Sequence, residues 1–243
     1  MPIVMNVIKD SLLKLVLLLS VVFVVSCEEY LPDGELFGTD EYVPSGAING
    51  HGYVDLGLSV KWATCNVGAS TPEECGGYYA WGETEEKDNY EWSTYKWANG
   101  TNRTITKYCT SSYYGTVDKK KILDAADDVA HVKWGGSWRM PTEDEQNELL
   151  NNCTLTWTTL NGIIGCKLTS TKNGNCIFLP VTGEYTETVI KRSQHGYYWP
   201  SSLCNNHDDF ASCLYFGDDN TLSVNRVGII SRYCGHTVRP VCE

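Results

Sequence analysis

The dipeptide Asn161-Gly162 is the feature of this chain that most constrains its fold. It separates two runs rich in β-forming residues, 156–160 and 163–169. Asn-Gly between such runs is typical of a two-residue type I′ turn, because both central residues need a left-handed backbone. Strands joined by so short a turn pair in antiparallel fashion. The sequence therefore predicts a β-hairpin over 156–169.

The rest of the C-terminal half also has the composition of short strands. A second Asn-Gly, at residue 173, repeats the turn signal ahead of an apolar run. Leu214 and Phe216 alternate with Cys213 and Tyr215, which predicts a strand with one buried face. Together with the N-terminal alternations, the strands expected outside the hairpin are 54–58, 60–65, 76–82, 176–180, 196–199, 211–216, 222–224 and 238–241.

Two helices are expected ahead of this strand-rich half. Thr142, followed three residues later by Glu145, forms a capping box that marks the start of one helix. Leu149 and Leu150 supply the buried side of that helix. Apolar residues at helical spacing over 122–132 predict the other helix. Few helices combined with many antiparallel strands indicate an α+β fold.

Composition narrows the class of protein further. The chain is 42% hydrophobic and 20% charged, which suits a folded domain rather than a disordered one. Its longest polar stretch, 83–117, is expected to be an extended loop with local strands. The formal charge of −11 argues against a nucleic-acid partner, since binding nucleic acid requires basic patches.

The N-terminus has the pattern of an exported lipoprotein. Lys9 and Lys14 precede an apolar run, 15–25, and a small residue stands just before Cys27. This order is that of a secretory signal peptide, here residues 1–26, with Cys27 as the lipidated residue of a bacterial lipoprotein. The alternative is a transmembrane anchor, but the uncharged run is only 11 residues long. A spanning helix needs about 20.

The residues after the cysteine extend this prediction. Glu28 and Glu29 resemble the surface-export signal of Bacteroidetes lipoproteins, which implies an outer-membrane protein anchored by lipid and exposed at the cell surface. Residues 27–49 then contain several Gly and Pro and are expected to form a flexible tether. A single domain is expected over 50–243.

Ten of the 11 cysteines lie after Cys27. No Cys-x-x-Cys occurs, so the spacing does not indicate a zinc site. An exported chain permits disulfides, and the connectivity stays open because ten cysteines allow too many pairings. We expect a mixture of disulfides and free thiols.

Six short motifs occur in an order that resembles a known family. They are YVDLGLSVKWATCNVGA (53–69), GGYYAWGET (76–84), WGGSWRMPTEDEQNEL (134–149), NGNCIFLPVTGEY (173–185), YYWPSS (197–202) and TVRPV (237–241). Together they are similar to the Fibrobacter succinogenes major paralogous domain family, in the versions found in Bacteroides-type lipoproteins. This resemblance covers nearly all of the chain after the tether. It implies a C-type-lectin-like fold with two helices, a twisted antiparallel sheet and long irregular loops.

The resemblance also implies a binding face in the C-terminal segment, 201–235. Related domains vary this segment to bind changing partners, and whether it is diversified in this chain stays open. We expect non-covalent recognition of a glycan or protein ligand there, with aromatic help from Tyr198. The candidate ligand-binding residues are Asn205, Asn206, His207, Asp208, Tyr215, Asn225 and Tyr233.

Two other functions stay open at the level of sequence. One is a structural or fimbria-associated envelope protein. The other is a thiol enzyme distantly similar to the formylglycine-generating sulfatase modifiers, for which Cys234 and Cys242 would be the reactive pair. No recognisable nucleophile, base and oxyanion donor assemble in the sequence, and the calcium-binding motifs of C-type lectins are absent. We therefore expect a protein that is not an enzyme and that uses no metal and no cofactor.

Two arginines are expected to be structural. Arg139 precedes the capped helix, and we expect it to pair in bidentate fashion with an acid and to fix the turn there. Arg239, in the Val-Arg-Pro motif, invites the same interpretation.

Overall fold

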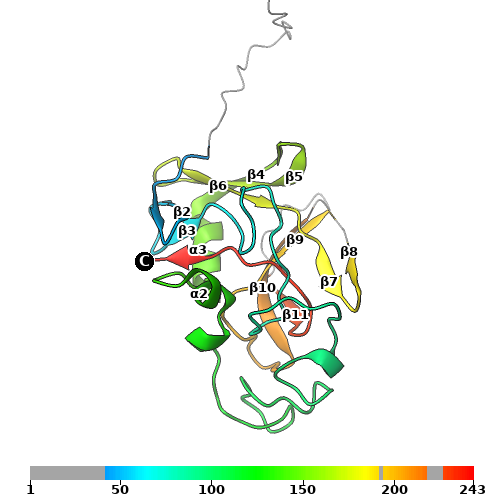
Figure 1. Ribbon diagram of the computed structural model, residues 1–243. Coiled ribbons are helices and arrows are strands. Elements are labelled where there is room, and N and C mark those ends of the chain that lie inside the picture. The colour runs from blue at the N-terminus through cyan, green and yellow to red at the C-terminus, as the bar shows by residue number, and fades with distance from the viewer. Residues whose placement is uncertain (1–41, 192–193, 218–226) are drawn as a thin grey trace, which may run out of the picture. The chain divides into compact units, whose positions relative to one another are not determined.

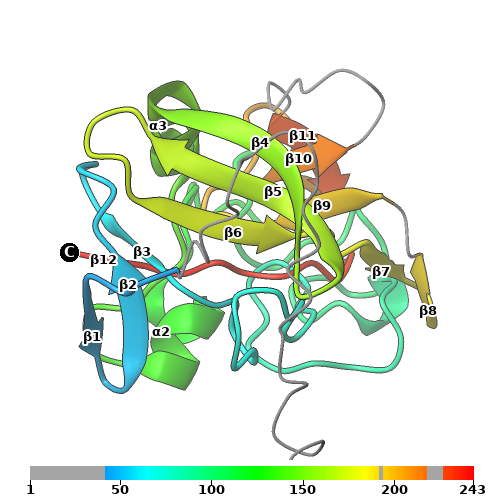
Figure 2. The same ribbon diagram turned by 90° about the horizontal axis from the view of Figure 1, so that it is seen from above.

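The predicted hairpin forms the longest pair of strands in the molecule (Figure 2). The computed structural model describes residues 42–191, 194–217 and 227–243. Strands β4 (Cys153–Leu160) and β5 (Ile163–Ser170) are antiparallel, with Leu160 opposite Ile163. Asn161 and Gly162 have φ angles of 49° and 81°, the left-handed pair that a type I′ turn requires. The hairpin prediction is confirmed.

Four antiparallel sheets make up the strand content. β4 and β5 continue into β6 (Cys176–Pro180), and β7 (Glu184–Thr186) pairs with β8 (Val189–Lys191). A second three-stranded sheet has the order β11-β10-β9, from β9 (His195–Tyr198), β10 (Phe210–Gly217) and β11 (Val227–Ser231). The four-stranded sheet has the order β1-β2-β3-β12, from β1 (Gly46–Ile48), β2 (His51–Val54), β3 (Lys61–Ala63) and β12 (Val241–Cys242). β12 lies beside β3 in Figure 2, so the last strand closes against one of the first.

The capped helix begins where its sequence predicts. α3 (Glu143–Asn152) has Thr142 as N-cap, and the Thr142 and Glu145 side chains form both bonds of the capping box. Leu149 is fully buried and Leu150 is half-buried. Because the cap is a local interaction of four residues, the sequence determines it without knowledge of the fold.

The helix expected over 122–132 is wrong in its first half. α2 (Val129–Trp134) begins seven residues later, and a short 3-10 turn, η2 (Ala125–Asp127), precedes it. The Asp128 carboxylate accepts a hydrogen bond from the His131 amide and so caps the helix at that point. Ile122 instead pairs with Ser202 in an isolated bridge.

An irregular region separates β3 from η2. We call residues 83–124 the long loop (cyan to green in Figure 1); among them the structure contains one 3-10 turn, η1 (Trp92–Thr94), and isolated bridges but no strand. The extended loop is confirmed over 83–117, without the local strands. The strand expected at 76–82 is wrong, since only Tyr79 makes a bridge there. Gly76 and Gly82 have left-handed backbones, with φ of 71° and 78°, which interrupt an extended strand.

Strand β10 is buried on both faces. Leu214 and Phe216 pack into an apolar cluster with Leu168 and Leu179 of the β4-β5-β6 sheet. Cys213 faces the other way, into a second cluster that contains four buried tryptophans, Trp81, Trp134, Trp138 and Trp199. The expectation of a single buried face is wrong here, because the chain packs apolar layers on both sides of the strand.

The described cysteines contradict the expected mixture. No disulfide joins any two of the ten that the structure describes. Six of them are buried, namely Cys109, Cys153, Cys166, Cys213, Cys234 and Cys242. Cys27 and the predicted signal peptide lie outside the described residues.

Candidate ligand-binding site

The predicted ligand-binding residues do not gather on one face. Asn205, Asn206 and His207 are exposed in the loop that leads into β10. Tyr215 is half-buried and lies in β10, five residues after the first residue of that strand. At the usual rise per residue, this places Tyr215 about 17 Å from the start of the strand, where the loop ends. Tyr233, also half-buried, packs edge-on against Trp92 of the long loop with ring centroids 5.2 Å apart. Asn225 lies outside the described residues.

Asp208 is not a surface contact. Its side chain is buried, with the residue only 1% exposed. It accepts hydrogen bonds from the Thr110 amide (2.7 Å), the Ser111 amide (2.8 Å) and the Thr110 hydroxyl (2.8 Å). The expectation that Asp208 belongs to an exposed row is therefore wrong, because the buried carboxylate accepts its hydrogen bonds from the long loop.

Arg232 complements Asp208, and no motif or spacing in the sequence selects it. Its guanidinium is fully buried and donates to the carbonyls of Lys107 (3.0 Å), Tyr108 (3.0 Å) and Asp208 (2.9 Å). It also donates to the Tyr95 hydroxyl at 2.9 Å and lies 4.8 Å from the Trp81 ring centroid. Asp208 and Arg232, both in the C-terminal segment, thus hold the long loop in place instead of facing a ligand.

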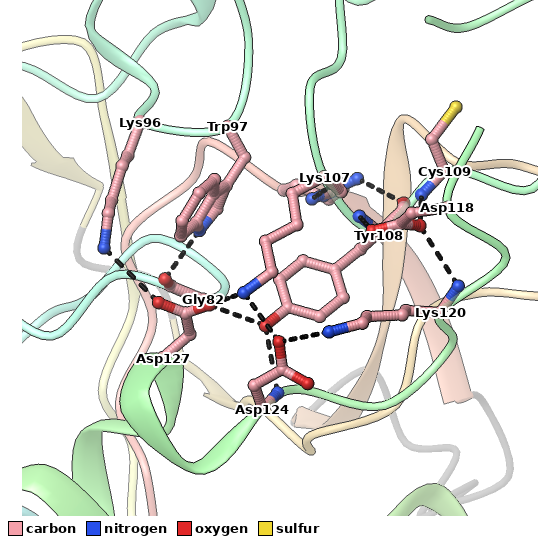
Figure 3. A network of polar contacts seen from close by, with 11 residues as sticks. Gly82, Lys96, Trp97, Lys107, Tyr108, Cys109, Asp118, Lys120, Asp124 and Asp127 are labelled. Carbon is pink, nitrogen blue, oxygen red and sulfur yellow. Dashed lines mark hydrogen bonds and ion pairs between the residues drawn. The ribbon is translucent and has the colours of Figure 1, made fainter. Parts of the chain in front are cut away.

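A network of charged groups fixes the far side of the same loop (Figure 3). Lys107 Nζ lies 2.7 Å from Asp124 and 2.6 Å from Asp127, and the Tyr108 hydroxyl donates to Asp127 at 2.6 Å. Burial alone raises the pKa of Asp127, but the bonds from Lys107 and Tyr108 outweigh burial and lower it below its ordinary value. Asp118 accepts the Tyr108 and Cys109 amides. These contacts hold Tyr108 in a left-handed backbone, with φ of 59°.

Three half-buried rings lie next to one another on the paired strands β9 and β10. We call His195, Tyr197 and Tyr215 the ring platform. The imidazole of His195 stacks on Tyr215 with centroids 5.1 Å apart and planes 28° apart. Tyr197 lies directly opposite Tyr215 in the sheet, and their centroids are also 5.1 Å apart. All three residues are half-buried.

A glycine makes this stack possible. Gly217 is the cross-strand partner of His195. A Cβ atom on Gly217 would lie 1.9 Å from His195 Cδ2, so any larger residue would push the imidazole off the sheet. The platform is consequently a product of strand register: residues 195 and 197 of β9 share a face with residues 215 and 217 of β10.

The same register corrects the role expected for Tyr198. Tyr198 points to the opposite face of β9, where it is 1% exposed and its hydroxyl donates to the Pro180 carbonyl at 2.7 Å. It supplies core packing, not ligand contact. The alternation His195-Gly196-Tyr197-Tyr198-Trp199 carries the signal that would have separated the two faces.

A buried histidine supports the platform from behind. His236 stacks between Tyr197 and Trp199, with centroid distances of 4.9 and 4.2 Å. Its Nε2 lies 3.4 Å from Glu184 Oε1 and its Nδ1 lies 3.6 Å from Cys213 Sγ. Burial lowers the pKa of His236 despite the nearby carboxylate, which favours a neutral imidazole. In that form Nε2–H donates to Glu184 and Nδ1 accepts from the thiol.

The order thiol, imidazole, carboxylate resembles a nucleophile with its base, but the environment opposes that chemistry. Cys213 is fully buried, and burial raises its pKa far above the ordinary value. Burial also raises the pKa of Cys234 and of Cys242, the pair expected of a thiol enzyme. A nucleophilic cysteine needs a lowered pKa and access to substrate. The geometry therefore supports a packing role for these thiols.

The two arginines selected from sequence behave differently. Arg139 pairs in bidentate fashion with Glu145, at 2.8 and 2.5 Å, as expected. Arg239 is buried and bonds Asn66 Oδ1 (2.8 Å) and the carbonyls of Ala63 and Thr64. No carboxylate bonds Arg239 among the described residues, so the expected acid partner is wrong for this position.

A separate pocket of about 460 Å³ lies beside α2 and away from the platform residues. Trp138, Met140 and Leu123 form apolar walls, and His131 and Arg139 contribute polar atoms. The Arg139 guanidinium is engaged by Glu145, and His131 Nδ1 lies 3.3 Å from the Trp138 carbonyl. Both polar groups of this pocket therefore already contact other groups of the protein.

Two structural findings bear on metals and membranes. Within the described ranges, no three His, Cys, Asp or Glu side chains cluster closely enough to hold a metal ion. In the same part of the chain, no helix has the length and apolar character needed to cross a membrane.

Comparisons with known proteins return nothing: no family model, no curated protein and no solved structure matches this chain. The case for function therefore depends on the geometry and chemistry of the chain itself.

Proposed function

We propose that this protein binds a glycan non-covalently through the ring platform of His195, Tyr197 and Tyr215. The observation that carries the proposal is the stack of three half-exposed rings on paired strands above Gly217. Aromatic rings with a polar tip suit sugars, because the ring packs against an apolar C–H face while the tip bonds hydroxyls. Paired strands hold such rings more precisely than loops do.

Glu184 adds a hydrogen-bond acceptor beside these rings. The bond from His236 lowers the pKa of Glu184, so the carboxylate is ionised at neutral pH. Its side chain is 20% exposed and lies 3.4 Å from His236 Nε2, and His236 stacks on the Tyr197 ring. An ionised carboxylate next to ring faces is a suitable partner for sugar hydroxyls.

A glycan array tests the proposal. The chain from residue 27 onward, carrying Cys27→Ser to prevent acylation, would be screened as wild type and as Tyr215→Ala. Tyr113→Ala is the matched control, because Tyr113 is 63% exposed and lies on the long loop. We expect saturable binding that Tyr215→Ala abolishes and Tyr113→Ala retains. If the folded protein bound no glycan on the array, the result would contradict the proposal that the ligand is a glycan. A protein ligand would then be tested.

We further propose that the protein is a lipoprotein of the outer membrane, anchored by an acyl group on Cys27 and exposed at the cell surface. The support is the sequence alone: the apolar run, the small residue before Cys27 and the acidic pair after it. Labelling with a palmitate analogue tests the anchor, and Cys27→Ala should abolish the label. Protease treatment of intact cells tests exposure, and a protected domain would contradict it.

The finer fold assignment is also a proposal. The structure is α+β, with α2 and α3 set among several antiparallel sheets. A C-type-lectin-like fold, and membership of the Fibrobacter succinogenes major paralogous domain family, are supported by the six ordered motifs and by the long loop. An experimental structure of this chain that superposes on a C-type-lectin-like domain would establish the fold, and one that does not would exclude it.

A further inference from the structure

Strand β4 is a long and unprotected sheet edge. It forms one end of the β4-β5-β6 sheet, and its outer edge pairs with no strand that the structure describes. Leu160 and Ile163 flank a two-residue turn, so Leu160 and every second residue before it bond β5. The backbone N–H and C=O groups of Leu155, Trp157 and Thr159 therefore point away from β5, toward the open edge.

The residues of β4 lack the features that normally block such an edge. The strand reads CTLTWTTL and contains no charged residue and no proline. Natural edge strands are usually short, charged, bulged or interrupted by proline, which prevents pairing with another chain. Thr, Leu and Trp instead favour a β-strand. At the tip of the same hairpin, Ile163 and Ile164 are 41% and 40% exposed.

The charge balance of the chain indicates what this edge can accept. With a net charge of −11, two copies of this chain repel each other overall. β4 is uncharged over its eight residues, so pairing there opposes no like charges. Because the strand has no charged side chain, it can form no ion pair with a partner chain.

We infer that β4 pairs antiparallel with β4 of a second copy of this chain, about a two-fold axis at Trp157. This register places the two Trp157 side chains opposite each other and Leu155 of each copy opposite Thr159 of the other. Cross-strand aromatic pairs stabilise a sheet, and a two-fold contact is self-complementary by symmetry. The dimer has one six-stranded sheet and carries two ring platforms, so it would bind repeated ligands with increased avidity.

Two substitutions should disrupt the contact between the β4 strands while each copy stays folded. Thr159→Pro removes an N–H that points outward, and proline is tolerated at such edge positions. Thr156→Lys adds a charge at an exposed position, and in the dimer the two added charges lie about 8 Å apart. Thr154→Lys is the matched control: it makes the same change on the same face, but its two copies lie about 20 Å apart, beyond the Debye length.

Sedimentation equilibrium across the micromolar range is the test, on the chain from residue 27 onward with Cys27→Ser. We expect twice the monomer mass for wild type and Thr154→Lys, and monomer mass for Thr159→Pro and folded Thr156→Lys. Hydrogen exchange should protect the Leu155 and Trp157 amides in the wild type and leave them exposed in Thr156→Lys. A monomeric wild type, or a dimer that Thr156→Lys leaves intact, would overturn the inference.

Discussion

Asp208 and Arg232 hold the same stretch of backbone with opposite polarity. The Asp208 carboxylate accepts the amides of Thr110 and Ser111, while the Arg232 guanidinium donates to the carbonyls of Lys107 and Tyr108. Arg232 also donates to the Asp208 carbonyl at 2.9 Å, which joins the two ends of the arrangement. The long loop satisfies only part of its own backbone, and these two side chains bond groups of it much as a neighbouring strand does in a sheet.

Asp208→Ala should destabilise the protein strongly, because it removes the buried acceptor of three hydrogen bonds from the long loop. We expect a loss of about 2–4 kcal/mol in the free energy of unfolding. Urea unfolding followed by tryptophan fluorescence measures this loss. Asp88→Asn, at an exposed position of the same long loop, should change stability by less than about 0.5 kcal/mol. Equal effects of the two substitutions would refute the role given to Asp208.

The charged network around Lys107 makes the free energy of unfolding depend on pH in the acid range. The pKa of Asp127 is lowered in the folded state from its ordinary value of 3.8, so the folded protein binds this proton less readily than the unfolded chain does. Its stabilising contribution is therefore complete above pH 3.8 and is lost as the pH falls through the lower folded value. The bonds of Asp124 to Lys107 and Lys120 lower its pKa as well, and the same direction applies.

Lys107→Gln should weaken this acid dependence, because the substitution removes the cation that both carboxylates contact. The check is urea unfolding at several pH values on either side of 3.8, in the wild type and the variant. The wild type should lose more stability between neutral and acid pH than Lys107→Gln does. Parallel curves for the two proteins would show that the network does not determine the acid response.

Two glycines on adjacent strands should separate binding from folding. Gly217→Ala places its new Cβ against His195, a half-exposed ring that can move away, so we expect weaker ligand binding with little loss of stability. Gly196→Ala places its Cβ 2.2 Å from the ring of Phe216, which is buried. Overpacking of that kind costs about 1–3 kcal/mol. Thermal unfolding and ligand titration of both variants test the contrast, which would be wrong if the two substitutions had the same effect.

Thiol reactivity distinguishes binding from thiol catalysis. Cys213 and Cys234 are buried with strongly raised pKa values, so a disulfide reagent should modify them only after unfolding. Cys204 is half-buried with its pKa raised to about 11, and it should react slowly but measurably in the native protein. Mass mapping of the modified residues reports each site separately. Rapid modification of native Cys234 would favour the thiol enzyme instead.

The elements that sequence predicted correctly depend on short-range interactions. The capping box of Thr142 and Glu145 and the Asn161-Gly162 turn each involve four residues or fewer, so local chemistry decides them. The apolar stripe that predicts this helix begins before Asp128, the N-cap of α2, so the predicted start of the helix lies too early in the sequence. In that segment, contacts with residues 201 and 202 take the backbone of Ile122 and Leu123 out of the helix.

The candidate site depended on contacts that sequence spacing does not reveal. Asp208 bonds Thr110 across 98 positions, and Arg232 bonds Tyr108 across 124, so neither role follows from neighbouring residues. The sequence analysis places Asp208 in an exposed polar segment and does not select Arg232, whereas both side chains are buried. The choice of Tyr198 over Tyr197 was an error of strand register, because a shift of one residue moves a side chain to the other face.

The most direct test of the central claim is a calorimetric titration of the best array ligand into wild-type, His195→Ala, Tyr215→Ala and Tyr113→Ala protein. The account predicts that each platform substitution weakens affinity about tenfold or more, the equivalent of roughly 1.4 kcal/mol, while Tyr113→Ala binds as the wild type does. Unchanged affinity in folded His195→Ala and Tyr215→Ala would contradict it, and would place the ligand elsewhere on the molecule.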